Sequence, residues 1–333
     1  MIIKVVGHDK KIFLKPQSNN PWSAFFSELE TAGAQIVTSG LSTKFDVLIA
    51  NSHSKKMIRK CKKFGVLKEN RILILWEPKE VNGKLYKTST LNSYGHIFTP
   101  SSDWLKGQNV YYFNWPQGKA IRKTQSDIEW LKRKNKIVFI GSNKYSISRG
   151  ELYSLRREVL KNDQNNKSID LFGHGWNQNI IYDILSILSS LLKTTYRNYS
   201  LKSLKLFAKH YNNYKGITNN KQKTLSKYKF ALVIENSNDY VSEKLFESLE
   251  SQCIVIYVGI NLNKHLNKNI AVQSNASAVD ISKKLTQILC LSNTKQLTLM
   301  KKQRKEYLKK NKDWENYKIL KNLARDSVNL LNI

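Results

Sequence analysis

Short apolar runs alternate with longer polar stretches along the first third of the chain. The runs lie at 2–6, 35–38, 45–50, 71–76, 96–99 and 110–113. Each has the length of a buried strand. The segments between them suit helices, and one follows Asn20-Pro21, where Asn can cap a helix and Pro fits its first turn. Strand and helix in alternation predict a mostly parallel sheet.

A second alternating series follows the polar stretch 120–135, which we interpret as the connection between two domains. We expect strands at 136–140, 168–172, 228–235 and 253–258, and helices at 147–160, 180–208 and 242–251. The charged segment from about Lys295 onward is typical of helix. A length of 333 residues suits two domains. We predict α/β domains at 1–125 and 136–293, followed by a helical tail at 294–333.

The charge balance raises the question of a nucleic-acid partner. Lys and Arg total 56 against 25 Asp and Glu, a net charge of +31, while 41% hydrophobic residues exclude a wholly disordered chain. Lys is spread along the chain together with Asn and Ile, a bias typical of AT-rich genomes. No zinc finger, helix-turn-helix or aromatic RNP pattern occurs. We expect no nucleic-acid partner, and a basic nucleic-acid-binding α/β protein stays as the alternative.

The cysteines and apolar runs bear on the compartment. Cys61, Cys253 and Cys290 are widely spaced and form no CxxC, which predicts a reducing environment without disulfides or a zinc site. The N-terminal run resembles a first strand more than a signal peptide. No run approaches the roughly 20 apolar residues of a membrane span. We expect a cytoplasmic protein whose basic faces can touch the inner face of an anionic membrane.

The segment Tyr228–Gly259 carries the most chemical information. It consists of a buried strand, the polar loop 235–240, a helix with an apolar inner face and a second β-branched strand. Ligands of open parallel sheets bind where strands end and helices begin. A helix start offers free N–H groups and a positive dipole end to phosphate, and Lys244 adds a charge there. The loop therefore lies at the expected ligand-binding edge.

This segment resembles the donor signature of the α1,3-fucosyltransferase family. The matching residues are Tyr228-Lys229-Phe230, Glu235-Asn236, Tyr240-Val241, Glu243-Lys244, Tyr257 and Gly259. Ile234 replaces the usual Phe, Ser242 replaces Thr and keeps the hydroxyl, and the usual Pro of the last strand is missing. Upstream, Ser142-Asn143 and Arg149 fit the family's S-N…R stretch.

The resemblance implies a GT-B glycosyltransferase, with two Rossmann-like domains facing a cleft and the donor in the second. The implied donor-site residues are Asn143, Arg149, Glu235, Asn236, Tyr240, Glu243 and Lys244. In this interpretation Arg149 and Lys244 hold the pyrophosphate, Glu243 holds donor hydroxyls, and Asn236 and Tyr240 shape the sugar and base pocket. The implied reaction moves fucose from GDP-fucose to a glycan hydroxyl with inversion, in surface polysaccharide or lipopolysaccharide synthesis. A different nucleotide-sugar donor is the alternative.

The first half offers one candidate for the catalytic base. A buried run ends at Trp76-Glu77-Pro78. The fucosyltransferases place a Glu in a comparable turn as the base, and Glu77 resembles that residue. Ordinary polarity at a strand end is the competing interpretation. No Asp-x-Asp occurs, so we expect phosphate to be neutralised by Arg and Lys, without a protein metal site or a required cofactor, although a divalent metal can stimulate.

Overall fold

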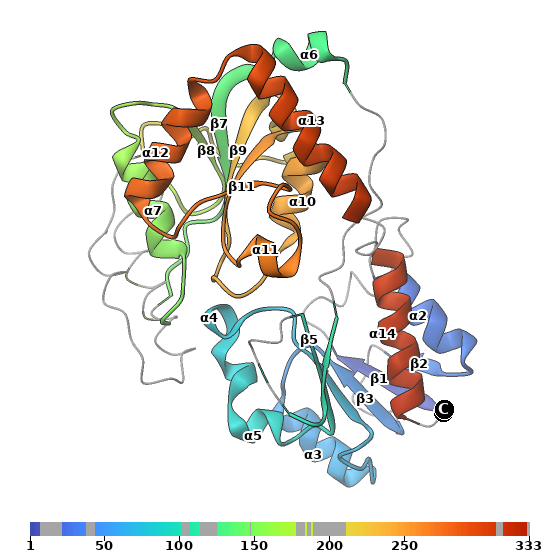
Figure 1. The fold of residues 1–333 in the computed structure, drawn as a ribbon. Coiled ribbons are helices and arrows are strands. Elements are labelled where there is room, and N and C mark those ends of the chain that lie inside the picture. Colours follow the sequence, from blue (N-terminus) through green and yellow to red (C-terminus); the bar gives the residue numbers. More distant parts are fainter. Residues whose placement is uncertain are drawn as a thin grey trace. The chain divides into compact units, whose positions relative to one another are not determined.

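The chain folds into two compact units. The computed structural model describes residues 1–6, 22–37, 44–100, 105, 107–113, 125–146, 148–177, 184, 188, 211–310 and 316–331. Unit 1 comprises Met1–Lys119 and Asp313–Ile333, and unit 2 comprises Ala120–Lys312 (Figure 1). Of the helical stretch expected at 180–208, only positions 184 and 188 lie within the described residues, and Asn20-Pro21 lies outside them.

Unit 1 contains a six-stranded parallel sheet in the order β2-β1-β3-β4-β5-β6. The strands are β1 (Ile2–Val6), β2 (Gln35–Val37), β3 (Val47–Ala50), β4 (Arg71–Ile74), β5 (His96–Thr99) and β6 (Val110–Tyr112). Every strand expected from the apolar runs of this half is present. Because all six strands are parallel, their carboxyl ends meet at one edge of the sheet.

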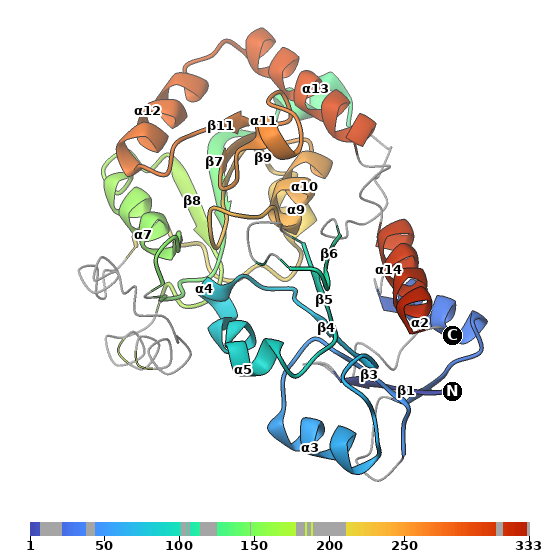
Figure 2. The same cartoon turned by 60° about the horizontal axis from the view of Figure 1, so that its bottom comes forward.

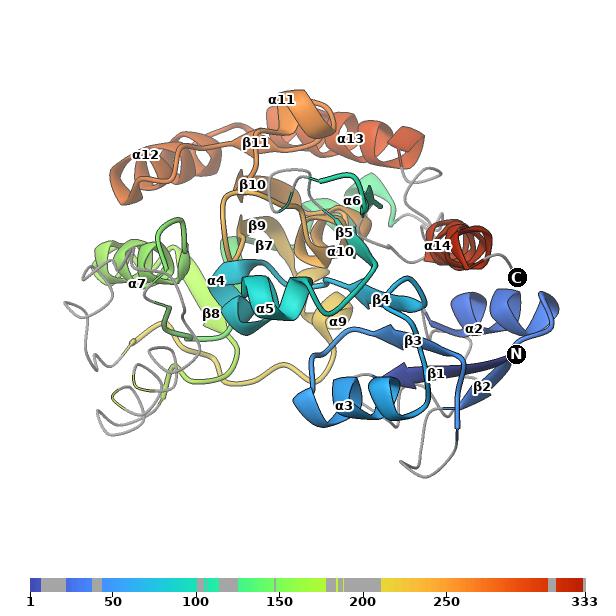
Figure 3. The same ribbon diagram turned by 90° about the horizontal axis from the view of Figure 1, so that it is seen from below.

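Helices cover both faces of this sheet (Figure 3). They are α2 (Trp22–Thr31), α3 (Lys55–Lys63), α4 (Lys79–Asn82), the 3-10 helix η1 (Gly83–Tyr86), α5 (Thr88–Leu91) and α14 (Asn316–Leu330). Phe25 and Leu29 of α2 and Leu320 and Leu323 of α14 enter one core with alternate residues of the strands. The side chain of Ser54 caps α3 by accepting a hydrogen bond from Met57 N.

Unit 2 contains a five-stranded parallel sheet in the order β11-β10-β9-β7-β8. The strands are β7 (Lys134–Ile140), β8 (Ile169–Phe172), β9 (Tyr228–Ile234), β10 (Ile254–Val258) and β11 (Val272–Gln273). The helices are α6 (Asp127–Leu131), α7 (Tyr153–Asn162), α9 (Lys221–Leu225), α10 (Glu243–Glu250), α11 (Leu262–His265), α12 (Ala278–Leu289) and α13 (Asn293–Lys310). α7 and α12 pack together on one face, and α9 and α10 pack together on the other (Figure 2).

The stretch 120–135 is not a plain connection, because it contributes α6 and the first residues of β7 to unit 2. Ser126 and Glu129 form a capping box at the start of α6. Trp130 is fully buried, and its indole nitrogen donates to the carbonyl of Gln252 at 2.8 Å. Arg133 donates to the carbonyl of Ser251 at 2.8 Å. These contacts fix the segment against the turn between α10 and β10.

The expected C-terminal helices are present, and they pack in different units. α13 packs on α10 and β10 in unit 2, where Met300 and Tyr307 are buried. α14 packs on α2 in unit 1, and Figure 2 shows the two helices side by side. The Glu28 carboxylate forms ion pairs with Lys321 Nζ at 3.0 Å and with Arg325 Nε at 2.5 Å. The apolar stripe of each helix thus packs in a different unit. Among the described residues, no helix is long and apolar enough to cross a membrane.

Candidate active site

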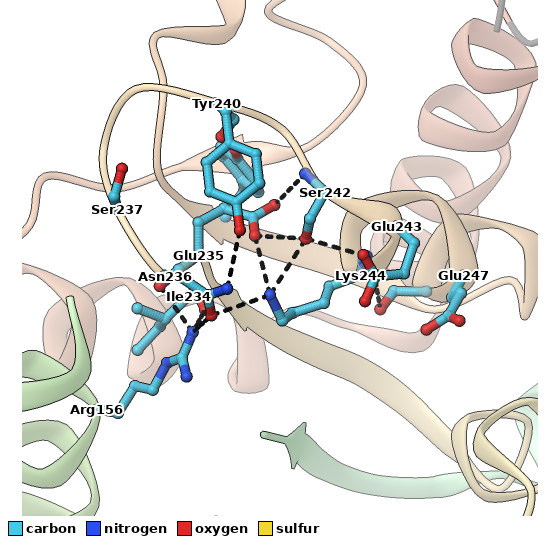
Figure 4. A network of polar contacts seen from close by, with 12 residues as sticks. Arg156, Ile234, Glu235, Asn236, Ser237, Tyr240, Ser242, Glu243, Lys244 and Glu247 are labelled. Atoms are coloured by element: carbon cyan, nitrogen blue, oxygen red, sulfur yellow. Dashed lines mark hydrogen bonds and ion pairs between the residues drawn. The ribbon is translucent and has the colours of Figure 1, made fainter. Parts of the chain in front are cut away.

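A buried carboxylate stands directly after β9. All seven residues of β9 are buried, and the Glu235 side chain that follows is 0% exposed. Its Oε1 accepts from Ser242 N at 2.9 Å, and its Oε2 accepts from Ser242 Oγ at 2.6 Å (Figure 4). A Cβ on Gly259 would lie 2.9 Å from Glu235 Cγ and 2.5 Å from the Tyr257 hydroxyl. The glycine of the signature therefore leaves room for the buried glutamate.

Lys244 balances this carboxylate from the first turn of α10. Its Nζ lies 3.2 Å from Glu235 Oε2, 3.2 Å from Ser242 Oγ and 3.4 Å from Asn236 Oδ1. An ammonium group has three hydrogens, so these three acceptors can use all of them. The Lys244 side chain is 20% exposed. Lys244 thus holds the loop after β9 together and neutralises a buried charge.

Asn236 and Tyr240 complete the same network. Asn236 Nδ2 donates to the Tyr240 hydroxyl at 2.8 Å. Tyr240 is 3% exposed, and its backbone carbonyl accepts from the Tyr257 hydroxyl at 3.3 Å. Four of the predicted donor residues, Glu235, Asn236, Tyr240 and Lys244, therefore meet in one hydrogen-bonded cluster at the carboxyl end of β9.

Arg156 is a member of this cluster that the sequence analysis missed. It lies on α7, is 2% exposed, and its Nη2 donates to the carbonyls of Ile234 at 2.7 Å and Glu235 at 2.8 Å. The same nitrogen donates to Asn236 Oδ1 at 2.8 Å. Burial lowers the pKa of Arg156, although Tyr153 and Glu235 act in the opposite direction.

Helical spacing could have revealed this arginine. Two adjacent arginines in a charged helix usually indicate a solvated surface. Arg156, however, lies four residues after Leu152, three before Val159 and four before Leu160, all of which are buried. Residues at these intervals share one helical face, so Arg156 belongs to the buried side of α7.

Asn143 joins two neighbouring loops instead of entering the cluster. Its backbone N donates to the carbonyl of His174 at 2.8 Å, and its Nδ2 donates to the carbonyl of Gly175 at 2.9 Å. Gly175 has φ +83°, and a Cβ there would lie 2.9 Å from the Asn143 carbonyl oxygen. This conformation and this close approach both favour glycine. Asn143 therefore fixes the loop after β7 to the loop after β8.

Two predicted residues at this edge lie apart from the cluster. Arg149 is exposed, and no hydrogen bond or ion pair of its side chain occurs within the described residues. It lies two residues before Glu151, which forms a bridge with Ser237 of the loop after β9. Glu243 is the first residue of α10, and its Oε1 lies 3.8 Å from Lys221 Nζ.

A cavity of about 250 Å³ opens beside the start of α10. Its polar lining includes Ser142 after β7, His174 after β8, Thr218, Glu243 and Lys244. The cavity therefore connects the loops that follow neighbouring parallel strands with a helix start, which is where ligands bind in open α/β sheets.

Glu77 lies in unit 1, in the turn between β4 and α4. It is half-buried, and its backbone carbonyl accepts a hydrogen bond from the Tyr86 hydroxyl at 2.8 Å. The structure places the expected carboxylate at the carboxyl edge of its sheet. Among the described residues, no group of three His, Cys, Asp or Glu side chains could hold a metal ion.

Comparison with known proteins identifies the fold. No family model matches the sequence, and no curated protein matches it. The crystal structure of Anabaena HepE in complex with UDP and glucose aligns with a TM-score of 0.57 at 8% identity, covering 98% of this chain and 99% of that one. A glycosyltransferase from Rickettsia africae aligns with a TM-score of 0.50 at 10% identity, covering 99% and 98%.

A third similar structure is longer than this chain. TarM aligns with a TM-score of 0.53 at 14% identity over 95% of this chain, which spans 59% of the length of TarM. Together these likenesses show the fold of GT-B glycosyltransferases, with two Rossmann-like parallel-sheet units and C-terminal helices. The resemblance to α1,3-fucosyltransferases rests on the motif residues alone.

Proposed function

We propose that this chain is a glycosyltransferase that takes a sugar from a nucleotide-sugar donor. The observation that carries the proposal is the cluster around Glu235 at the carboxyl end of β9, in a chain with the GT-B fold. Four of its members, Glu235, Asn236, Tyr240 and Lys244, are residues of the donor signature, and Gly259 leaves room for the buried carboxylate. A hydrogen-bonded loop at a ligand-binding edge can hold the fixed geometry that a donor site needs.

GDP-fucose is the donor that the motif favours. Tyr228-Lys229-Phe230, Glu235-Asn236 and Glu243-Lys244 support it because they match successive blocks of the fucosyltransferase signature. A UDP-sugar is the second candidate, and the fold likeness to HepE, whose crystal structure contains UDP and glucose, supports it. Ser142, His174 and Lys244 line the cavity that either donor would approach.

The proposed reaction is attack of a glycan hydroxyl on the anomeric carbon, with inversion. A hydroxyl is too weakly acidic to attack unaided, so Glu77 would accept its proton as the new glycosidic bond forms. The bond from the anomeric carbon to the diphosphate breaks, and negative charge develops on the leaving group. Arg149 and the N–H groups at the start of α10 would stabilise that charge, while Lys244 keeps the α10 start in place.

The acceptor in this proposal is a glycan of surface polysaccharide or lipopolysaccharide synthesis. The enzyme itself is cytoplasmic and can contact the inner membrane face. The enzyme requires no cofactor, and a divalent metal can stimulate it by shielding the diphosphate.

A thermal-shift screen with nucleotides tests the donor assignment. GDP or GDP-fucose at one hundred times its dissociation constant should add about 2.7 kcal/mol of stability. A larger shift with UDP or UDP-glucose would select the second candidate instead. Absence of any shift with GDP, UDP, CMP and dTDP derivatives, together with salt-sensitive binding to DNA or RNA, would overturn the proposal in favour of a nucleic-acid-binding protein.

A further inference from the structure

A second cavity, of about 330 Å³, lies in unit 1 beside the carboxyl end of β3. Its described lining contains Lys55, Lys84 and Lys87 together with His53, and no carboxylate. Ser52 and Ser89 add hydroxyl groups that can donate hydrogen bonds. The lining is therefore cationic and rich in donors, although no reaction step has been assigned to it.

The backbone holds these lysines in place while their side chains stay exposed. Lys84 lies on η1, and its carbonyl accepts from Thr90 Oγ1 at 3.1 Å. Lys87 directly precedes α5, and Lys55 is the first residue of α3. Within the described residues, none of the three forms an ion pair with a carboxylate. Their charges therefore face the cavity or solvent uncompensated.

The local field also favours a negative ligand. α3 has nine residues and directs its positive dipole end toward the segment that lines the cavity. His53 and the three lysines of the lining are all positive when charged. Burial and the nearby charge of Lys55 lower the pKa of His53. Bringing like charges together costs free energy, which a bound anion would recover.

The cavity is linked to the turn that carries the proposed base. β3 and β4 are adjacent strands, with Ala50 paired to Leu73, so their carboxyl ends lie side by side. Tyr86, two residues after Lys84, donates its hydroxyl hydrogen to the Glu77 carbonyl at 2.8 Å. A molecule bound at the lysines would therefore lie at the same sheet edge as Glu77.

We propose that this cavity binds an anionic group, a phosphate or a carboxylate, carried by the acceptor glycan. The acceptor is then an acidic sugar or a sugar phosphate, and Lys84 and Lys87 select it. The identification of the ligand as an acceptor rests on the proposed glycosyltransferase function, but anion binding itself can be measured without a donor.

Calorimetric titration of the full chain with glucose 6-phosphate, glucuronate and glucose tests the site. The anionic sugars should bind and glucose should not, and the stronger of the two anions identifies whether phosphate or carboxylate is preferred. The double variant Lys84→Gln/Lys87→Gln should weaken anion binding about tenfold or more, because each lysine supplies a charge-assisted hydrogen bond. A matched control, Lys62→Gln/Lys63→Gln, changes two exposed lysines at the other end of α3 and should bind like the wild type.

The outcomes separate this site from the donor site. Equal binding of glucose and the anions, or unchanged anion affinity in Lys84→Gln/Lys87→Gln, overturns the inference even where nucleotides stabilise the protein. Nucleotide affinity should be the same in that variant and in the wild type. Lysine-dependent anion binding in a chain that binds no nucleotide would support the anion site and refute the proposed function instead.

Discussion

Replacing Lys244 with Met isolates the role of the ion pair beneath the candidate donor site. Lys244→Met keeps a long apolar stem but removes the charge that faces Glu235 Oε2 at 3.2 Å. Glu235 keeps its two bonds from Ser242 N and Oγ, and its side chain stays 0% exposed. The variant therefore leaves a buried carboxylate without its cation.

The structure sets the expected magnitude. Breaking a buried ion pair by removing one partner costs about 3–5 kcal/mol, and the 20% exposure of Lys244 places this case near the lower end, at about 3 kcal/mol. For a unit of this size that corresponds to a decrease in Tm of about 6–12 °C. Glu235→Gln should cost less, about 1–2 kcal/mol, because the freed Lys244 ammonium can turn toward water.

Denaturant unfolding of both single variants and of the double variant Glu235→Gln/Lys244→Met measures the coupling. The double variant lacks both charges of the ion pair, so it should be more stable than Lys244→Met alone. Lys227→Met, at an exposed lysine, serves as the control and should change stability by less than about 0.5 kcal/mol. Equal losses in the two single variants, or a double variant that loses their full sum, would refute the reasoning.

Three further predictions concern the proposed chemistry and the pH response. Arg149→Ala should weaken nucleotide binding in a titration without lowering Tm, because the side chain is exposed; unchanged affinity would remove Arg149 from the phosphate site. Glu77→Gln should abolish sugar transfer in an activity assay while nucleotide affinity is kept, and normal turnover would refute its role as base. Burial lowers the pKa values of His53 and His96, so both bind protons more weakly when folded, and stability should fall as the pH drops below 6.5. The double variant His53→Gln/His96→Gln should lose less stability between pH 7 and pH 5 in denaturant unfolding; an unaltered pH profile would contradict this assignment.

The strands were predictable because each apolar run is both short and buried. β9 and β10 lie inside their sheet, so their residues apart from Lys229 are apolar on both faces, and the sequence shows this directly. The segment 120–135 was misjudged for the opposite reason. Only Trp130 in its short helix is fully buried, and one buried residue leaves no periodic pattern to detect.

The candidate site was predictable in part. Glu235, Asn236, Tyr240 and Lys244 were found through the resemblance to the fucosyltransferase donor signature, and the structure brings them together. Their partners within the protein were not predictable, because hydrogen bonds such as the one from Arg156 to Asn236 join residues 80 positions apart. The resemblance implied that Lys244 binds phosphate. In the structure its ammonium group donates hydrogen bonds to three acceptors within the protein.

The hydrogen bonds of Lys244 within the protein bear on which lysines of the chain are available to bind an anion. At the candidate donor edge Lys244 pairs with Glu235, and Lys221 pairs with Glu247 at 3.0 Å and with Glu243 at 3.8 Å, so both lysines already face carboxylates. The lysines of the unit 1 cavity have no such partners within the described residues. A net charge of +31 attracts anions, and the lysines of the unit 1 cavity are placed to bind an anionic acceptor. The difference in affinity between glucose 6-phosphate and glucose measures this attraction directly.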